Sequence, residues 1–293
     1  MTITAQMVKE LRERTGAGMM ECKKALVETQ GDIELSIENM RKSGMAKAAK
    51  KAGRVASEGR IDVKVSEDNV LAAMLEVNSE TDFVARDSNF TEFTQSVLDL
   101  VLTSQTTDVD AILNLQMKDG QTVEETRQAL INKLGENIQI RRAIILKSEG
   151  TLAGYVHGDR IGSLVALSTT DQPLAKDIAM HIAASNPQVI KPEDVSEDLV
   201  QKEKDIFAAQ SAESGKPPEI IEKMVTGRIN KFRNEIALTG QPFVKDPNQT
   251  VANLLTSAKA DVTAFARFEV GEGIEKEVED FAEAVMAQVS GGA

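Results

Sequence analysis

At 293 residues, with 41% of them hydrophobic, the chain is long for one ordinary core and can bury about two or three. Its formal net charge of −12 argues against a broad phosphate-binding surface, because nucleic-acid-binding proteins usually carry a basic field. A single cysteine excludes an internal disulfide and fits a reducing compartment. The sequence shows neither a signal-peptide pattern nor an apolar run of the roughly 18–20 residues that a membrane span needs. We therefore expect a cytoplasmic protein of several domains, with no membrane contact and with nucleic acid disfavoured as a partner.

Residues 1–53 show the periodicity of three short helices. Gly16 suits the left-handed end of the first helix, and the second is expected at about residues 20–29. Asp32 can cap the third, which we expect to end at residues 43 and 44. A core of fewer than about 50 residues is marginal, so this domain is expected to recognise a partner rather than to hold an active site.

A basic run follows at residues 46–54, with three lysines and one arginine. Such a run can be a solvated linker helix, or it can contact RNA or an acidic partner. We favour the linker helix, because no aromatic residue is interleaved that could stack on bases.

Residues 54–148 change to alternating periodicity and are predicted to form an α+β subdomain. The expected elements are a β-hairpin with arms at 61–65 and 70–77, helices at 84–100, 108–115 and 123–134, and a returning strand at 138–146.

A second α+β subdomain is predicted at residues 149–190 and 238–271. Its expected elements are a hairpin at 151–157 and 161–168, a helix at 174–184, a short helix at 251–258 and a returning strand at 262–270. Residues 165–171 align with residues 76–82, which indicates a duplicated core of two related copies. The first copy has Phe83 where the second has Gln172 and Pro173, so the copies differ at this corner.

Two further helical segments are expected. Residues 191–237 interrupt the second copy and are predicted to form an antiparallel helical hairpin. Its two apolar stripes are expected to bury each other. Any apolar face that remains exposed would be available to a partner, so a higher-order assembly through the hairpin is an open alternative. Residues 272–293 are predicted to form a C-terminal helical module that docks on the body or on a partner.

The sequence offers no frame for catalysis or for metal binding. His157 and His181 have no nearby cysteine, so no standard zinc spacing exists. Cys22 lies on an apolar helix face without a neighbouring histidine, which favours a buried structural thiol over a nucleophile. We therefore expect a protein that is not an enzyme and needs no metal or cofactor. The alternatives left open are an adaptor that only tethers its partners and an enzyme whose site has escaped notice.

Four segments, in order along nearly the whole chain, are similar to the bacterial elongation factor Ts family, the guanine-nucleotide exchange factors of elongation factor Tu. They are LRERTGAGMM at 11–20, EVN at 76–78 with TDFVA at 81–85, LGENI at 134–138 and FEVGEG at 268–273. The resemblance implies a ubiquitin-associated-like three-helix domain at residues 1–53, followed by the duplicated core, the inserted hairpin and the C-terminal module.

The resemblance also implies a function and a set of contact residues. The protein would bind elongation factor Tu in its GDP-bound and nucleotide-free states, promote GDP release and leave when GTP binds. Four residues would dislodge magnesium from the partner's nucleotide site: Thr81, Asp82, Phe83 and Val84. The other implied contacts are Arg12, Met19, Met20, Leu134 and Gly135 on the G domain, and His157 and Val244 on another domain of the partner.

Overall fold

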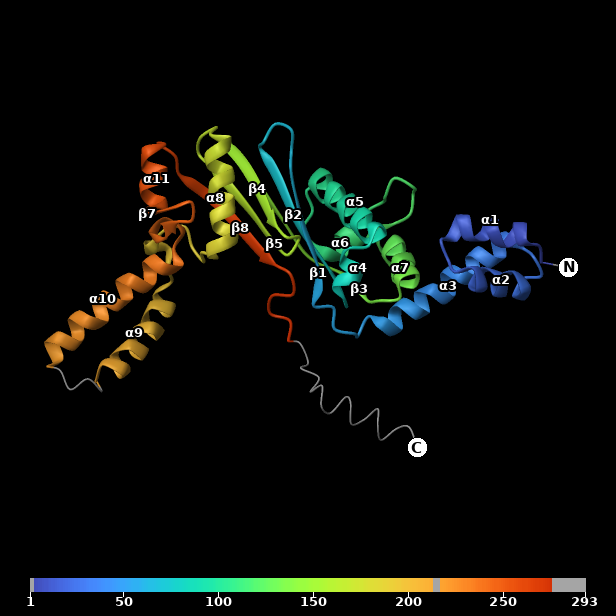
Figure 1. The fold of residues 1–293 in the computed structure, drawn as a ribbon, viewed down its shortest axis with the longest axis horizontal. Helices are drawn as coiled ribbons and strands as arrows, with labels where there is room; N and C mark the ends of the chain where they lie inside the picture. The colour runs from blue at the N-terminus through green and yellow to red at the C-terminus, as the bar shows by residue number, and fades with distance from the viewer. Residues whose placement is uncertain (1–2, 213–216, 276–293) are drawn as a thin grey trace.

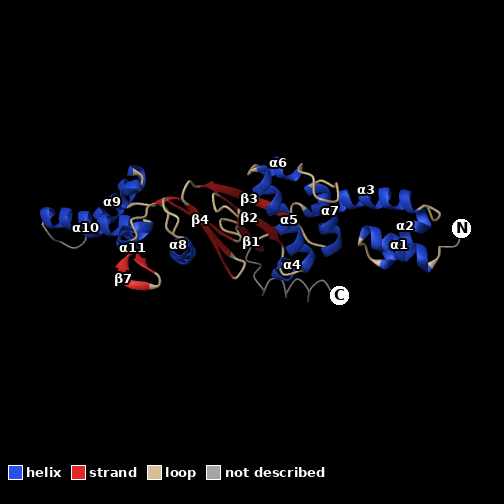
Figure 2. Ribbon diagram, turned by 90° about the horizontal axis from the view of Figure 1, so that it is seen from above, coloured by secondary structure: helices blue, strands red, loops and turns tan. Residues whose placement is uncertain are grey.

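The computed structural model describes residues 3–212 and 217–275, and it shows a mixed α+β protein with antiparallel sheets. Figure 1 shows an elongated molecule, with helices α1, α2 and α3 at one end and helices α9 and α10 at the other. Two three-stranded sheets lie between these ends, and the view from above in Figure 2 shows the same order.

The N-terminal module consists of α1 (Ala5–Thr15), α2 (Met19–Glu28) and α3 (Ile33–Lys51). The chain leaves α1 through Gly16 at φ 66°, and the Asp32 side chain caps α3 by accepting the Leu35 N–H, as the sequence predicted. Cys22 is fully buried in the small core of this module, which confirms its assignment as a structural thiol.

The third helix does not end at residues 43 and 44, and that prediction is wrong. It runs to Lys51, because its second half packs against α7 (Val123–Leu134). A Cβ atom on Gly44 would lie 2.5 Å from Nδ2 of Asn132, so glycine here permits a close approach of two helices instead of stopping one. The basic run is therefore mostly the end of the same helix.

The first sheet consists of β1 (Glu58–Val65), β2 (Leu71–Ser79) and β3 (Ile138–Lys147) in that order. The remaining helices of this part of the chain are α4 (Asp82–Ala85), α5 (Ser88–Ser104) and α6 (Val109–Leu113). Alternate residues of β2 point to opposite faces. Leu75 and Val77 pack under α5 and α7, while Met74 faces the second sheet.

The second sheet consists of β4 (Thr151–His157), β5 (Ile161–Leu167) and β8 (Val262–Glu269), again a hairpin followed by a returning strand. Helix α8 (Gln172–Ser185) covers it on the side away from the first sheet. The other elements are α11 (Val251–Ser257) and a small two-stranded sheet of β6 (Pro242–Phe243) and β7 (Asp246–Thr250), which the sequence did not reveal.

The two large sheets pack face to face through an apolar layer that includes Ile61, Met74 and Leu164. One buried charge reinforces the junction at the end of this layer. The Glu76 carboxylate is fully buried and accepts hydrogen bonds from Arg141 at 2.9 Å, Arg142 at 2.5 Å and the Gly271 N–H at 2.9 Å. Buried charges need such partners, so this network links the first sheet to the segment that follows β8.

The inserted hairpin is present as α9 (Glu197–Ala212) and α10 (Pro218–Ile236). Val225 and Ile229 are buried, whereas Leu199, Ile206 and Ile220 remain exposed, so the two helices bury only part of their apolar surface in each other. The predicted C-terminal helix falls on residues 276–293, which lie outside the described residues. None of the described helices has the length and apolar character to cross a membrane.

Candidate functional site

The corner after β2 holds an aromatic side chain in an unusual position. Phe83 is 82% exposed, while its neighbour Val84 is buried in the core beneath α5. Both lie on the single helical turn α4, on which adjacent residues point about 100° apart. Because Val84 and Ala85 are anchored in the core, Phe83 has to point away from it. The fold thus presents one apolar ring to the outside at a fixed place.

Two polar residues frame Phe83. Thr81 is the N-cap of α4, and its hydroxyl accepts the Val84 N–H at 3.4 Å. Asp82 lies in the first turn, where a carboxylate is favoured by the helix dipole, and pairs with Arg86 at 3.0 Å. The Asp82 side chain is still 45% exposed, so it remains accessible to a partner.

A second loop, residues 135–137, lies against this corner. The Glu136 carboxylate accepts the Thr81 N–H at 2.9 Å and the Thr81 hydroxyl at 2.6 Å. The Glu80 carboxylate in turn accepts the Asn137 N–H at 2.6 Å. Leu134 and Gly135 therefore lie beside the corner, as expected from the resemblance. The roles of Glu80 and Glu136 were not foreseen, because nothing in a single sequence signals a contact over about 55 residues.

The contact residues expected on the N-terminal module are exposed. Met19 is 60% and Met20 is 74% exposed at the start of α2, and Arg12 is exposed on α1. Adjacent exposed apolar side chains of this size can form part of a contact surface for a partner. Helix α3 joins this module to the first subdomain, where Lys51 donates to the Gly135 carbonyl at 2.6 Å and Arg41 pairs with Glu125.

These contacts bear on the basic run at residues 46–54. Lys51 is engaged with Gly135, and Arg54 lies 3.5 Å from Glu80. Part of its positive charge thus holds the module to the core, which weakens the case for an RNA contact.

His157 and Val244 lie on or between strands that follow the first sheet in the chain. His157 is exposed at the end of β4, where its Nδ1 atom lies 3.2 Å from the Tyr155 hydroxyl. Val244 is 42% exposed in the turn between β6 and β7. The two side chains come from different elements, and the structure places each of them at the surface.

A buried histidine, which sequence reasoning tested only as a zinc ligand, supports the Val244 turn. Nδ1 of His181 accepts the Val244 N–H at 3.1 Å, and Nε2 faces the Gln241 amide oxygen at 2.9 Å. Since Nδ1 is an acceptor, the proton of the neutral ring belongs on Nε2. Burial lowers the pKa of His181, and the hydrogen bond to Gln241 opposes this only in part.

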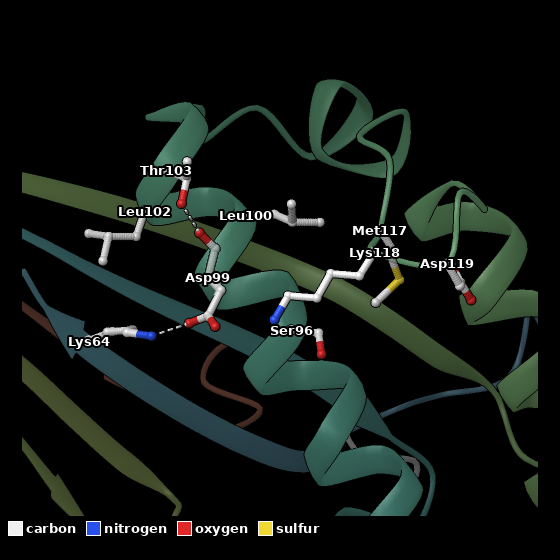
Figure 3. Close-up of a pocket in the computed structure, with 9 residues that line it drawn as sticks. All are labelled: Lys64, Ser96, Asp99, Leu100, Leu102, Thr103, Met117, Lys118 and Asp119. Atoms are coloured by element: carbon white, nitrogen blue, oxygen red, sulfur yellow. Dashed lines mark hydrogen bonds and ion pairs between the residues drawn. The ribbon is translucent and has the colours of Figure 1, made fainter.

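Two surface hollows flank α5, but neither resembles a catalytic site. The larger, of about 460 Å³, lies between α5 and residues 117–119. In Figure 3, Lys64 pairs with Asp99 on one side and Lys118 extends towards Ser96. The smaller, of about 310 Å³, lies between Gly16 and α7. No cysteine or histidine lines either hollow, and among the described residues no cluster of histidine, cysteine and carboxylate groups could hold a metal ion.

Comparison with known proteins identifies the family. The family described as "Elongation factor TS" matches residues 80–272, a stretch that begins at the corner itself. A protein named elongation factor Ts from Thioalkalivibrio sulfidiphilus is 61% identical, over 99% of this chain and 100% of its own length. The chain belongs to the elongation factor Ts family. Relatives with the same name from Alcanivorax borkumensis and Legionella pneumophila (strain Lens) are 59% and 55% identical, over 97% and 98% of this chain and 100% and 99% of their own lengths.

Membership in the elongation factor Ts family makes this chain a factor of translation elongation, as the resemblance predicted. The similarity to relatives extends over all the elements described above, not only the corner. Family membership does not by itself assign a role to any individual contact residue.

Proposed function

We propose that this member of the elongation factor Ts family binds elongation factor Tu carrying GDP and promotes GDP release. It does so by displacing magnesium and distorting the nucleotide site, and it leaves when GTP binds. The observation that carries the proposal is the exposure of Phe83 on a turn whose other side is anchored in the core. A ring held in this way can enter a partner without refolding of the corner, so little ordering entropy is lost on binding.

The magnitude of the effect limits what Phe83 can do alone. Raising nucleotide release about 10⁴-fold requires roughly 5.5 kcal/mol of coupling between the two binding sites. Burying one phenylalanine side chain supplies only about 1.5–3 kcal/mol. The remainder must come from other contacts that are made fully only when the nucleotide site is distorted.

Those contacts are proposed from exposure and from their attachment to the corner. Met19 and Met20, with Arg12, would hold the G domain from the N-terminal module, and Leu134 and Gly135 would hold it beside Phe83. The following two residues would contact another domain of the partner: His157 and Val244. We also propose the domain boundaries, the duplicated origin of the core and the ubiquitin-associated-like nature of residues 1–53 as expected from the sequence.

Displacement of magnesium weakens GDP binding. Mg²⁺ requires a nearly ideal octahedral shell and neutralises phosphate charge, so a small shift of its ligands removes much of its contribution. Asp82 and Phe83 would cause that shift by entering beside the site. Linkage is reciprocal, so bound GDP with magnesium must weaken the affinity of elongation factor Tu for this chain by the same factor.

The exchange activity is tested by release of a fluorescent GDP from elongation factor Tu and magnesium, with and without the full chain. We expect release to accelerate by several orders of magnitude and to saturate with the concentration of the chain. An adaptor that only tethers its partners would bind elongation factor Tu in the same experiment and leave the release rate unchanged. That result would overturn the proposal.

We further propose that the chain is a binding protein of the cytoplasm rather than an enzyme, and that it needs no cofactor.

A further inference from the structure

Two loops far apart in the sequence hold each other through a reciprocal pair of carboxylates. Residues 80 and 81 lead from β2 into α4, and residues 135–137 lead from α7 into β3. Glu136 binds the backbone and side chain of Thr81, and Glu80 binds the backbone of Asn137. We call these four residues the clasp: Glu80, Thr81, Glu136 and Asn137.

The clasp lies directly beyond the end of a strand pair. Ser79, the last residue of β2, pairs with Ile138, the first residue of β3. The clasp continues the connection beyond this pair, with carboxylates as acceptors in place of backbone carbonyls. Hydrogen bonds to a charged acceptor are roughly twice as strong as neutral ones. Glu80 is further held by Arg54, and Lys51 donates to the carbonyl of Gly135 within the same loop.

The hydroxyl of Thr81 connects the clasp to Phe83. It donates its proton to Glu136 at 2.6 Å, and its oxygen accepts the Val84 N–H. A hydroxyl has only one proton to donate, so the bond to Glu136 leaves its lone pairs for the cap of α4. A helix of four residues has no cooperative stability of its own, so its direction depends on how its ends are held.

We propose that Glu136 is a positioning residue. Through Thr81 it holds the N-terminal end of α4, while Val84 and Ala85 anchor the same turn in the core. The two supports together keep Phe83 in one outward direction before any partner is bound, and Glu136 joins Leu134 and Gly135 to the same rigid frame. This inference rests on the proposed exchange function and assigns Glu136 a part in it, although Glu136 itself need not contact the partner. The competing explanation is that the clasp only stabilises the fold.

The test compares three variants of the full chain: Glu136→Ala, Glu136→Gln and Glu67→Ala. Alanine removes both acceptors from Thr81. Glutamine can keep both contacts, because its amide oxygen accepts the Thr81 N–H and its NH₂ group donates to the hydroxyl. Glu67 is exposed in the turn at the opposite end of the β1–β2 hairpin, so it is the matched control for loss of a carboxylate.

Two readouts separate positioning from stability. In Glu136→Ala we expect amide hydrogen exchange over residues 81–86 to rise at least about tenfold, while exchange in β2 and β3 stays protected. The maximal rate of GDP release should fall about tenfold, which is about 1.4 kcal/mol, with affinity for nucleotide-free elongation factor Tu within about twofold of the original. Glu136→Gln and Glu67→Ala should retain both properties.

Several results would overturn the inference. Unchanged amide exchange at residues 81–86 in Glu136→Ala would show that Glu136 does not hold the corner. A purely structural role would appear as equal losses of affinity for elongation factor Tu and of the maximal rate of GDP release, together with faster amide hydrogen exchange throughout the sheet. Added to Phe83→Ala, the Glu136→Ala change should cost almost nothing further, and a full additional loss would mean that Glu136 acts elsewhere. If the original chain fails to accelerate release at all, the proposed function fails, and amide exchange alone decides whether the corner is held.

Discussion

Phe83 and Val84 are adjacent in the chain and have opposite surroundings, one exposed and one buried. A ring that stays 82% exposed gains little free energy from folding, and burial against a partner would supply that gain instead. The polar residues around it are all engaged, Thr81 with Glu136 and Asp82 with Arg86. At the scale of single residues, the corner thus combines one exposed apolar side chain, Phe83, with neighbours that are held by hydrogen bonds, an ion pair and burial in the core.

His181 gives a prediction at the same scale. Its folded-state pKa is lowered by burial, so the unfolded chain binds a proton more readily than the folded chain. The stabilising contribution is therefore complete above the ordinary histidine value of 6.5 and is lost as the pH falls below it towards the folded pKa. Protonation of Nδ1 would also break the bond from the Val244 N–H.

Urea denaturation of the full chain between about pH 8 and about pH 5 measures this effect. We expect the free energy of unfolding to fall with decreasing pH, and we expect His181→Gln to flatten that fall while lowering stability at pH 8. His157→Gln is the matched control, because it removes the other histidine from an exposed position. An identical pH dependence in His181→Gln and the original chain would show that His181 is not the group responsible.

The elements show how far a single sequence can specify this fold. Helix α7 was predicted at its observed bounds. In the structure Thr122 caps it and Gly135 follows it at φ 84°, and both are local features that a sequence can carry. Helix α3 was predicted too short, because Gly44 has a tertiary role that local rules cannot express. The β6–β7 pair was missed, since two residues of strand carry too little pattern.

In the candidate site too, some residues could be predicted from the sequence, and other contacts appear only in the structure. Phe83 was singled out from its place at a turn, and the exposure of Met19 and Met20 agrees with a surface role. The clasp and the Val244–His181 bond join segments 55 or more residues apart, and hydrophobic periodicity contains no information about such pairs. Only the packed structure brings them together.

The helical hairpin offers a prediction at the scale of elements. Its base is closed by a parallel bridge between Val189 and Ala237, and the Leu238 N–H donates to the Val189 carbonyl at 2.9 Å. Residues 196–235 can therefore be replaced by a short glycine–serine linker without separating the strands of the second sheet. Gln188 donates to the Ile236 carbonyl at 2.8 Å, so residue 236 is retained.

We expect this deletion variant to keep its core, because none of the residues in the two apolar clusters around the second sheet lies between 196 and 235. Its thermal melting should stay cooperative, and the loss should appear in affinity for elongation factor Tu more than in the maximal rate of GDP release. If the deletion variant no longer accelerated GDP release but kept its full affinity for elongation factor Tu, the assignment of affinity to the hairpin and of release to the corner would be wrong.

At the scale of the whole molecule, the proposed action of the corner requires distant surfaces to be held in a fixed relation to it. Helix α3 connects the exposed methionines of α2 to the first subdomain, and the Glu76 network connects that subdomain to the segment after β8. In the proposed function, binding energy from these surfaces would drive Phe83 into the partner, which a single side chain could not do. The central claim is that Phe83 converts binding into nucleotide release and adds little to binding itself.

Stopped-flow release of fluorescent GDP from elongation factor Tu and magnesium tests that claim most directly, with Phe83→Ala compared with Ile206→Ala, which removes an exposed apolar side chain from the hairpin. Phe83 is 82% exposed, so its replacement should change the free energy of unfolding by less than about 0.5 kcal/mol. We predict that the maximal release rate falls about 10- to 100-fold in Phe83→Ala, while affinity for nucleotide-free elongation factor Tu stays within about threefold. An unchanged maximal rate, or an equal loss of rate and affinity, would contradict the account.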